Sequence, residues 1–305
     1  MKQQGWRHAS TVALTPRGLV GLLKSTFAAW LDDHAPTMGA ALAYYTLFSM
    51  APLLLIAISV AGAVFGVDAA RAEMLAQLQG LLGLEGAEAV ASLLRSVQRN
   101  EQSISGTVIG SVLLLIGATT VFAELQDALD RIWKVPPRPD VDVPVNAWWL
   151  LLRARLVSFG MILGIGFLLM VSLAVSAALA AWGRWWAPAF GSWETLLQLA
   201  NHAFGFVMTA GLFALIYKYM PRQRVAWPDV WLGSAVTALL FTLGKAAIAW
   251  YIGSSGLTSG FGAASSVVVL LVWVYGSAQL FLLGAEFTWV FAHRYGSRRA
   301  PAAMP

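Results

Sequence analysis

The chain has 305 residues, of which 58% are hydrophobic and 11% are charged. Soluble domains contain about 25% charged residues, so the composition excludes an ordinary soluble protein and favours one integral membrane domain. The net charge of +5 is spread over short connections, a pattern that suits anionic lipid headgroups better than a nucleic-acid groove. The absence of cysteine excludes disulfides, thiolate metal sites and cysteine nucleophiles.

Six long apolar stretches alternate with more polar connections, and about 20 apolar residues are enough for a helix to cross a bilayer. The stretches are residues 38–65, 105–122, 156–182, 199–217, 230–252 and 264–292. We therefore expect an all-α membrane protein with six transmembrane helices inside residues 38–292. Residues 1–37 would form a cytoplasmic N-terminal segment, and residues 293–305 a basic cytoplasmic tail.

Residues 17–31 carry leucine and aromatic side chains at helical spacing. Thr15 followed by Pro16 is typical of an N-cap and a first helical position. The pattern predicts an amphipathic helix. Such a helix either lies in the membrane interface or packs on the cytoplasmic face of the bundle, and the sequence supports both equally.

The first apolar stretch contains Pro52. Proline lacks a backbone donor and clashes with the carbonyl four residues earlier, so we expect a kink near Phe48–Pro52. The 28 residues of this stretch would form a helix about 42 Å long, which exceeds the hydrocarbon thickness. Tilt or the kink must absorb the difference.

The connection 66–104 has two groups of apolar residues at helical spacing, one on each side of Gly83 and Gly86. This pattern predicts an extracytoplasmic helical hairpin that covers the outer end of the bundle. A structured loop without a ligand is the alternative, and we favour it over a ligand site.

An acidic cluster, Glu124, Asp127 and Asp130, begins the connection 123–155 on a predicted helical extension. Such a cluster could bind a divalent metal. Arg131 and Lys134 are adjacent, however, so an ion-paired, solvated helix is the better interpretation. We expect no metal site.

The distribution of Lys and Arg predicts the orientation. The N-terminus has four, the second connection five, the fourth connection three and the C-terminal tail three, whereas the opposite side has four in total. Basic residues concentrate on the cytoplasmic side of membrane proteins, so both termini should be cytoplasmic. Tryptophans near the ends of the stretches are typical of an aromatic belt.

Two ionisable residues, Lys245 and Glu286, lie inside apolar stretches, where a charge costs roughly 3 kcal/mol on insertion scales. Counting along their helices places them about 13 Å apart in depth, beyond the reach of a lysine unless tilt closes the gap. We hypothesise that each faces a polar cavity. Alternatively, Lys245 extends outward to the interface, and Glu286 caps against a cytoplasmic-side Arg or Lys.

Further polar side chains in the spans include Tyr44, Tyr45 and Gln279. In lipid, such groups mostly hold helices together by interhelical hydrogen bonds, and a lined permeation path is the alternative. Glycine pairs permit close helix contacts at Gly62/Gly66, Gly106/Gly110 and Gly160/Gly164.

The four histidines are scattered and have no metalloprotease spacing, and neither a phosphate loop nor a nucleophile elbow occurs. We therefore expect no enzyme activity and no cofactor.

Several motifs resemble the YihY/BrkB family of bacterial inner-membrane proteins. They are Ala40-Ala-Leu-Ala-Tyr-Tyr-Thr-Leu-Phe-Ser-Met-Ala-Pro-Leu-Leu54, Leu125-Gln-Asp-Ala-Leu-Asp-Arg-Ile-Trp133, Leu243-Gly-Lys245, Gly260-Phe-Gly-Ala-Ala-Ser-Ser266 and Leu283-Gly-Ala-Glu286. The resemblance covers roughly residues 20–292 and implies a six-span, all-helical protein of the inner membrane. Some members carry an older ribonuclease label, which nothing in these residues supports.

Our first hypothesis is a transporter or lipid-handling protein in which Glu286, Lys245 and the Pro52 kink line or gate a polar cavity. The second is a non-catalytic membrane scaffold that docks a partner through residues 69–99. The expected partners are the lipid bilayer and anionic phospholipids at its cytoplasmic face, without nucleic acid, and a homo-oligomer is left open. A water-filled cavity that reaches both Lys245 and Glu286 would favour the first hypothesis.

Overall fold

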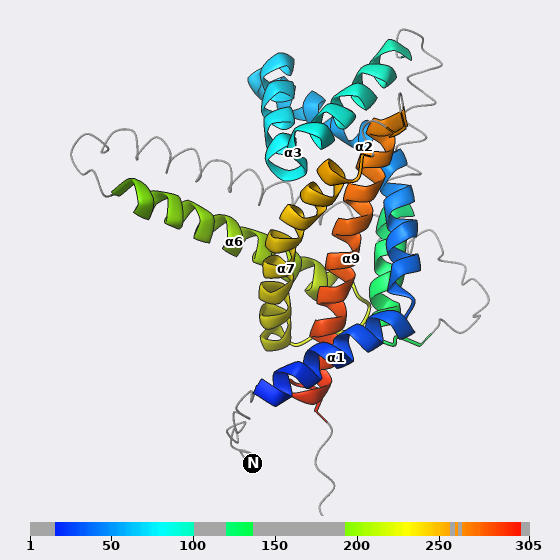
Figure 1. The fold of residues 1–305 in the computed structure, drawn as a ribbon, viewed down its shortest axis with the longest axis vertical. Helices are drawn as coiled ribbons and strands as arrows, with labels where there is room; N and C mark the ends of the chain where they lie inside the picture. Colours follow the sequence, from blue (N-terminus) through cyan, green and yellow to red (C-terminus); the bar gives the residue numbers. More distant parts are fainter. Residues whose placement is uncertain (1–15, 101–119, 137–192, 257–259, 262–263, 300–305) are drawn as a thin grey trace, which may run out of the picture.

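The computed structural model describes residues 16–100, 120–136, 193–256, 260–261 and 264–299 (Figure 1). Throughout these residues the backbone forms helices joined by turns and loops, and it contains no strand, which confirms the all-α class. The predicted spans 105–122 and 156–182 lie almost entirely outside the described residues. The six-span count therefore stays a prediction.

Helices α1 (Pro16–Asp32) and α2 (Ala35–Phe65) meet at a tight turn. His34 has φ 58° and ψ 37° there, a left-handed conformation that breaks the helical path. Helix α1 lies across the end of α9, where Leu22 packs against Phe287 and Val290 (Figure 1). The structure thus confirms the predicted first helix and places it on the end of the bundle.

Helix α2 confirms that the first apolar stretch is helical, although the helix begins at Ala35 rather than at residue 38, and it continues through Pro52 without ending there. It stops at Gly66, whose φ of 87° is readily accessible only to glycine. A Cβ on Gly62 would lie 2.9 Å from Val67 Cγ2, so this glycine lets α3 begin close against the end of α2. The predicted kink at Pro52 remains a prediction.

Helix α3 (Val67–Asn100) crosses the end of the bundle opposite α1 and changes direction as it does so (Figure 1). The predicted helical character is confirmed, but Gly83 and Gly86 do not end a helix: α3 is one helical element. Its residues Ala89, Val90 and Leu94 are buried against Ile58 of α2 and Leu270 of α9. Burial of this apolar face outweighs the helix-weakening effect of the two glycines.

The centre of the bundle consists of α7 (Trp227–Ser254) and α9 (Ser265–Arg294), and the C-terminal half of α6 (Trp193–Tyr219) packs into it, while its start projects away (Figure 1). They confirm the helical character of the predicted stretches 199–217, 230–252 and 264–292. Of the helices within the described ranges, α7 and residues Val267–Arg294 of α9 are long and apolar enough to cross a membrane. Both pack side by side along their length (Figure 1).

Exposed tryptophans mark both ends of α7. Trp231 is 52% exposed and Trp250 is 74% exposed. The 19 steps from Trp231 to Trp250 correspond to about 29 Å along a helix, close to the thickness of the hydrocarbon core. Their spacing is that of two aromatic belts at opposite headgroup levels.

Helices α7 and α9 touch through a reciprocal arrangement of glycine and threonine. A Cβ built on Gly233 of α7 would lie 1.9 Å from Thr288 Oγ1 of α9, and one on Gly284 of α9 would lie 2.0 Å from Thr237 Oγ1 of α7. Each threonine also donates a hydrogen bond to the glycine carbonyl four residues earlier in its own helix. Two Gly-x-x-x-Thr segments therefore interlock in antiparallel fashion, and small residues of this kind allow close helix contact in membranes.

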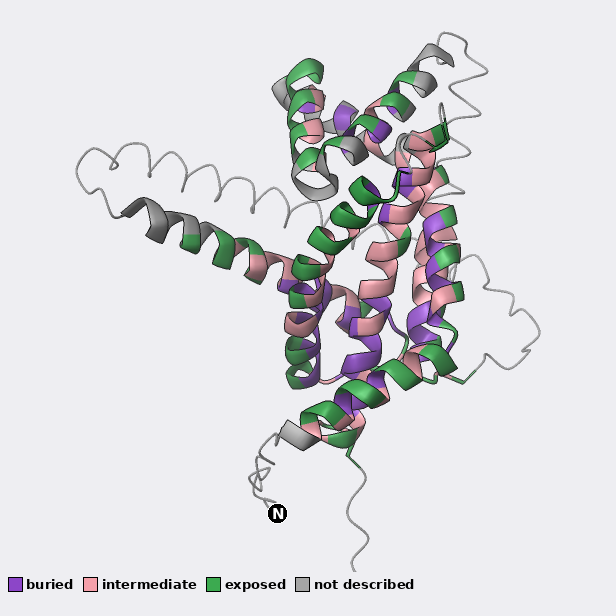
Figure 2. Ribbon diagram, in the orientation of Figure 1, coloured by how far each residue is buried: buried purple, intermediate pink, exposed green. Residues whose placement is uncertain are grey.

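Buried residues concentrate where α2, α6, α7 and α9 approach α1 (Figure 2). This core includes Leu129, Tyr217, Val230 and Leu282, all fully buried. It also contains the helical residues 120–132, which precede a loop at the same end of the bundle. The polar side chains described next lie in this part of the molecule.

Candidate functional site

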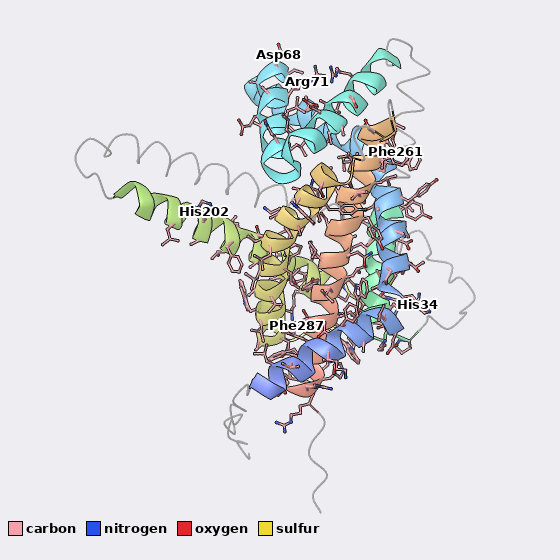
Figure 3. The ribbon with its side chains drawn as sticks, in the orientation of Figure 1. His34, Asp68, Arg71, His202, Phe261 and Phe287 are labelled. Carbon is pink, nitrogen blue, oxygen red and sulfur yellow. The ribbon has the colours of Figure 1, made fainter. Side chains whose placement is uncertain are left out.

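Glu286 lies on the buried face of α9, one helical turn after the fully buried Leu282. Its side chain is 0% exposed, and neither carboxyl oxygen receives a hydrogen bond from a described residue. Figure 3 labels Phe287, the next residue of α9, and His34 in the α1–α2 turn. Glu286 therefore faces the interior of the protein, and its predicted place at a polar cavity stays a prediction.

A second carboxyl group lies beside Glu286. Asp33, in the turn between α1 and α2, is within hydrogen-bonding range of the Glu286 carboxyl, and Asp32 and Lys134 act on it electrostatically. Asp33 is itself an acceptor, so two ionised carboxylates here leave Glu286 without a donor. Asp33 and Lys134 are 101 positions apart in the sequence, and Glu286 lies a further 152 positions after Lys134. All three thus meet in one cluster.

Lys134 holds Asp33 in place. Its ammonium group donates to both Asp33 carboxyl oxygens and lies 5.5 Å from the centre of the Trp289 ring. Its φ of 52° is left-handed, and this conformation ends the helical segment 120–132 and directs the chain into the loop. The Lys134 side chain is 49% exposed and the Asp33 side chain 10%, so the ion pair connects the surface to the buried Glu286.

Two indole groups near this cluster also lack partners. The Nε1 atoms of Trp30 and Trp133 are buried without an acceptor among the described residues. Trp30 precedes Asp33 by about one helical turn, and Trp133 immediately precedes Lys134. Buried polar groups without partners are uncommon in proteins, and an indole N–H can only donate, so each would need an acceptor. Their concentration at this end of the bundle identifies it as the candidate site.

Lys245 does not belong to the Glu286 cluster. Its neighbour Gly244 packs against Leu280 of α9, so Lys245 lies six to seven residues from the level of Glu286, or about 10 Å along the axis. Its ammonium group is half-buried and lies 5.7 Å from the centre of the Phe241 ring on its own helix. The structure therefore places the two predicted ionisable residues at different depths.

Gln279 joins α9 to α2. Its Nε2 donates to the Pro36 carbonyl at 3.4 Å, and a Cβ on Gly39 would lie 2.0 Å from the same nitrogen. Its Oε1 is buried and has no donor among the described residues. Gln279 therefore holds two helices together, as expected for a polar side chain inside a span.

Tyr44 and Tyr45 form an aromatic group on α2 with Phe48. The Tyr44 ring lies 5.5 Å from that of Tyr45 and 4.8 Å from that of Phe48, and Tyr44 is 55% exposed. Pro52 lies one turn further along α2. Its side chain is outside the described part of the structure, so its predicted gating role stays a prediction.

Further polar links fasten the same end of the bundle. Asp130 accepts from the Arg222 backbone at 2.8 Å and from its guanidinium at 2.5 Å. Ion pairing is confirmed for this member of the acidic cluster, but Asp130 is buried and its partner is the distant Arg222, so the expected solvated position is wrong for it. Asp229, in the first turn of α7, accepts from the Ser297 hydroxyl at 2.5 Å. The Arg298 guanidinium stacks 5.2 Å from the centre of the Trp133 ring. The residues after α9 therefore fold back onto the start of α7.

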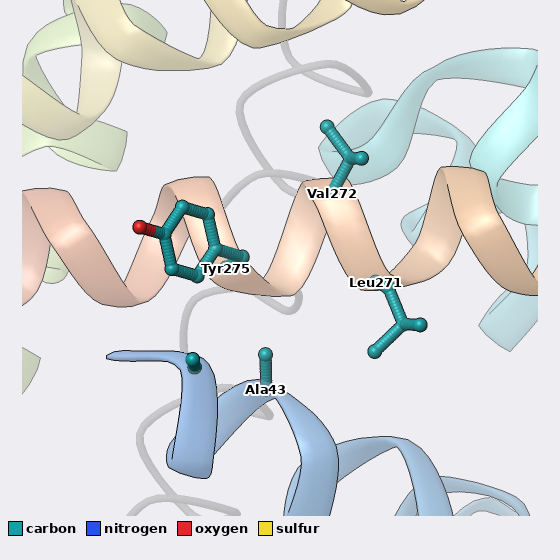
Figure 4. Close-up of a pocket in the computed structure, with 5 residues that line it drawn as sticks. Ala43, Leu271, Val272 and Tyr275 are labelled. Carbon is teal, nitrogen blue, oxygen red and sulfur yellow. The ribbon is translucent and has the colours of Figure 1, made fainter. Parts of the chain in front are cut away.

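A shallow hollow of about 260 Å³ opens between α2 and α9 (Figure 4). Its lining is mostly apolar, and the residues are Ala40, Ala43, Leu271, Val272 and Tyr275. Neither Lys245 nor Glu286 lines it. Its shape and chemistry fit a hydrocarbon chain better than an ion.

Comparison with known proteins decides the family. Residues 26–305 match the family model described as Virulence factor BrkB. The chain belongs to the BrkB family. The resemblance drawn from its motifs is thereby confirmed, and the protein is a membrane protein.

The curated relatives of this BrkB-family chain include UPF0761 membrane proteins. That of Neisseria meningitidis serogroup B is 26% identical over 84% of this chain and 60% of its own length. That of Tolumonas auensis is 27% identical over 84% of this chain and 80% of its own length. The chain thus spans about 60% of the length of the Neisseria relative. No solved structure matches it.

The motifs that resemble the BrkB family include Glu286 but neither of its charged neighbours Asp33 and Lys134. Asp33 and Lys134 lie outside the apolar stretches, where charged residues are ordinary. The sequence interpretation places Lys134 on a solvated helix. A partly buried ion pair between distant connections leaves no periodic signal, so only the folded chain reveals it.

Proposed function

We propose that this BrkB-family protein is a multi-pass transporter of the bacterial inner membrane that handles a lipid or another amphipathic substrate. The observation that carries the proposal is the buried Glu286 carboxyl, which has no donor among the described residues and lies beside Asp33. Ionisable groups within membrane spans are expensive, and they mark substrate or ion pathways. We propose no catalytic role for this cluster.

The proposed topology has six spans, with both termini in the cytoplasm. Apolar side chains of α1 that point away from the bundle support an interfacial position for this helix, since they would enter the headgroup–acyl boundary. These are Leu19, Val20, Leu23, Phe27 and Leu31, each at least 45% exposed. Helix α1 would therefore both pack on α9 and lie on the cytoplasmic membrane surface, among anionic phospholipids.

The substrate class follows from the α2–α9 hollow. A mostly apolar hollow that is open on one side suits an acyl chain that enters from the bilayer. The polar Glu286 cluster lies further along the same two helices, toward α1. Together they present an apolar and a polar contact to one amphipathic molecule.

Reconstitution tests the proposal. Purified protein in liposomes should move a fluorescent phospholipid between leaflets, measured as the fraction quenched from outside. Ala40→Trp should fill the hollow and slow this movement, whereas Ala247→Trp, at an exposed position of α7, should not. Glu286→Gln should also slow it. Equal rates in empty liposomes, wild type and all variants would refute a lipid-transport function.

A membrane scaffold that docks a partner through α3 is the second candidate. The observation in its favour is that the α2–α9 hollow reaches neither Lys245 nor Glu286, while Val67 and Leu84 of α3 are 54% and 60% exposed. Under this function Leu84→Lys should abolish partner capture and leave lipid movement unchanged.

A further inference from the structure

The charges around Glu286 do not balance when every group is ionised. Asp33 and Glu286 are carboxylates, and Lys134 supplies one compensating positive charge between them. Asp32, at the end of α1, is the remaining charged group that acts on Glu286, and it is exposed. One added positive charge would make the net charge of Asp33, Lys134 and Glu286 zero.

A proton is the cation that fits this place. Among the described residues, no group of three or more His, Cys, Asp or Glu side chains could hold a metal ion. A metal cation such as magnesium or calcium needs about six oxygen ligands, and the backbone carbonyls of a helix interior are already hydrogen-bonded. A proton needs only one carboxyl oxygen to bind and one neighbouring acceptor to receive its hydrogen bond.

We propose that Asp33 and Glu286 together bind one proton, and that this proton is the coupling ion of the transport proposed above. The proton adds to a Glu286 carboxyl oxygen, and the resulting hydroxyl donates to an Asp33 carboxyl oxygen. No other bond changes, and water is the source and the acceptor of the proton. This part of the inference rests on the proposed function, whereas the proton site itself does not.

Lys134 links the proton site to the surface. Its side chain is half-exposed, and its ammonium group donates to both Asp33 carboxyl oxygens. The ion pair therefore lies between water and the Asp33–Glu286 pair.

Infrared spectroscopy of the purified full-length chain tests the proton site directly, because protonated carboxyl groups have a carbonyl stretch that carboxylates lack. The difference between neutral and alkaline solution should contain this band at the frequency of a water-excluded carboxyl group. Glu286→Gln should abolish the band, and Asp33→Asn should shift it because the acceptor changes. Asp127→Asn, at an exposed position, should leave it unchanged.

The inference fails if the wild-type difference spectrum has no such band, if the band survives in Glu286→Gln, or if Asp33→Asn leaves its position unaltered. Gel filtration and circular dichroism establish that each variant is folded. If Glu286→Gln does not fold, the shift of the band in Asp33→Asn still tests the proton site. A band with these responses but no lipid movement in liposomes contradicts the proposed function alone. Lipid movement without the band contradicts the proton site alone.

Discussion

The reciprocal glycine–threonine contact between α7 and α9 leads to the sharpest stability prediction. In Gly284→Ala the new Cβ would lie 2.0 Å from Thr237 Oγ1 and 2.8 Å from both Thr237 Cβ and Cγ2, whereas ordinary contact begins at 3.4 Å. Rotation of Thr237 cannot relieve the overlap, because its Cβ is fixed by the α7 backbone. The two helices must therefore move apart by about 1 Å or distort, as overpacked cores do.

Separation of the helices also disturbs hydrogen bonds at the same level. Thr237 Oγ1 lies 3.1 Å from the Tyr217 hydroxyl of α6, and that hydroxyl donates to the Phe281 carbonyl of α9 at 2.7 Å. Overpacking costs about 1–3 kcal/mol, and an interhelical hydrogen bond in a membrane protein contributes about 0.6 kcal/mol. The free energy of unfolding should fall by roughly 2–4 kcal/mol, which corresponds to a Tm lower by roughly 4–8 °C.

Thermal unfolding in detergent, followed by the fluorescence of the 14 tryptophans, measures this change. The matched control is Gly211→Ala in α6, where a new Cβ meets no atom within 4 Å. It should leave the Tm unchanged or raise it slightly, since alanine favours helix more than glycine does. A Gly284→Ala protein as stable as wild type, or a Gly211→Ala protein that loses as much stability, would refute the close α7–α9 contact.

Three further outcomes are expected. Asp130→Asn should lower the free energy of unfolding by about 3 kcal/mol because it breaks a buried ion pair. The control Asp127→Asn, on the exposed side, should change it by less than about 0.5 kcal/mol, and equal losses in denaturant titrations would contradict the pairing. Leu22→Ala should cost about 2–3 kcal/mol in the same titration because it empties the contact between α1 and α9, whereas Leu23→Ala, 53% exposed, should cost far less. Alkaline phosphatase inserted in α3 should be active and a fusion at the C-terminus inactive; the opposite activities would overturn the proposed orientation.

Most of what could be predicted came from the apolar stretches and from the few polar residues inside them. The helix before the first apolar stretch and the helical nature of residues 38–65, 230–252 and 264–292 followed from length and periodicity, because a helix in lipid must satisfy its own backbone. Glu286 stood out for the same reason: a carboxyl group in an apolar run is costly, so its burial could be inferred from its neighbours in the chain.

Other features depended on how the helices meet. The sequence interpretation pointed to the glycine pair Gly62/Gly66, whereas the interlocked contact of α7 and α9 uses Gly233 and Gly284, each paired with a threonine on the other helix. Many glycines in a membrane chain have helical spacing. Only the rotation of two helices about their axes selects those that face each other.

The sequence by itself determined the solvent, the helical class and the family, since these depend on composition and on motifs read along the chain. It also identified Glu286 as a residue that needs a reason to be buried. Only the tertiary structure decided what surrounds it, because Asp33 and Lys134 come from connections whose local sequence is ordinary. It likewise separated Lys245 from Glu286, since the depth at which two side chains meet depends on how antiparallel helices are aligned, and no single helix contains that information.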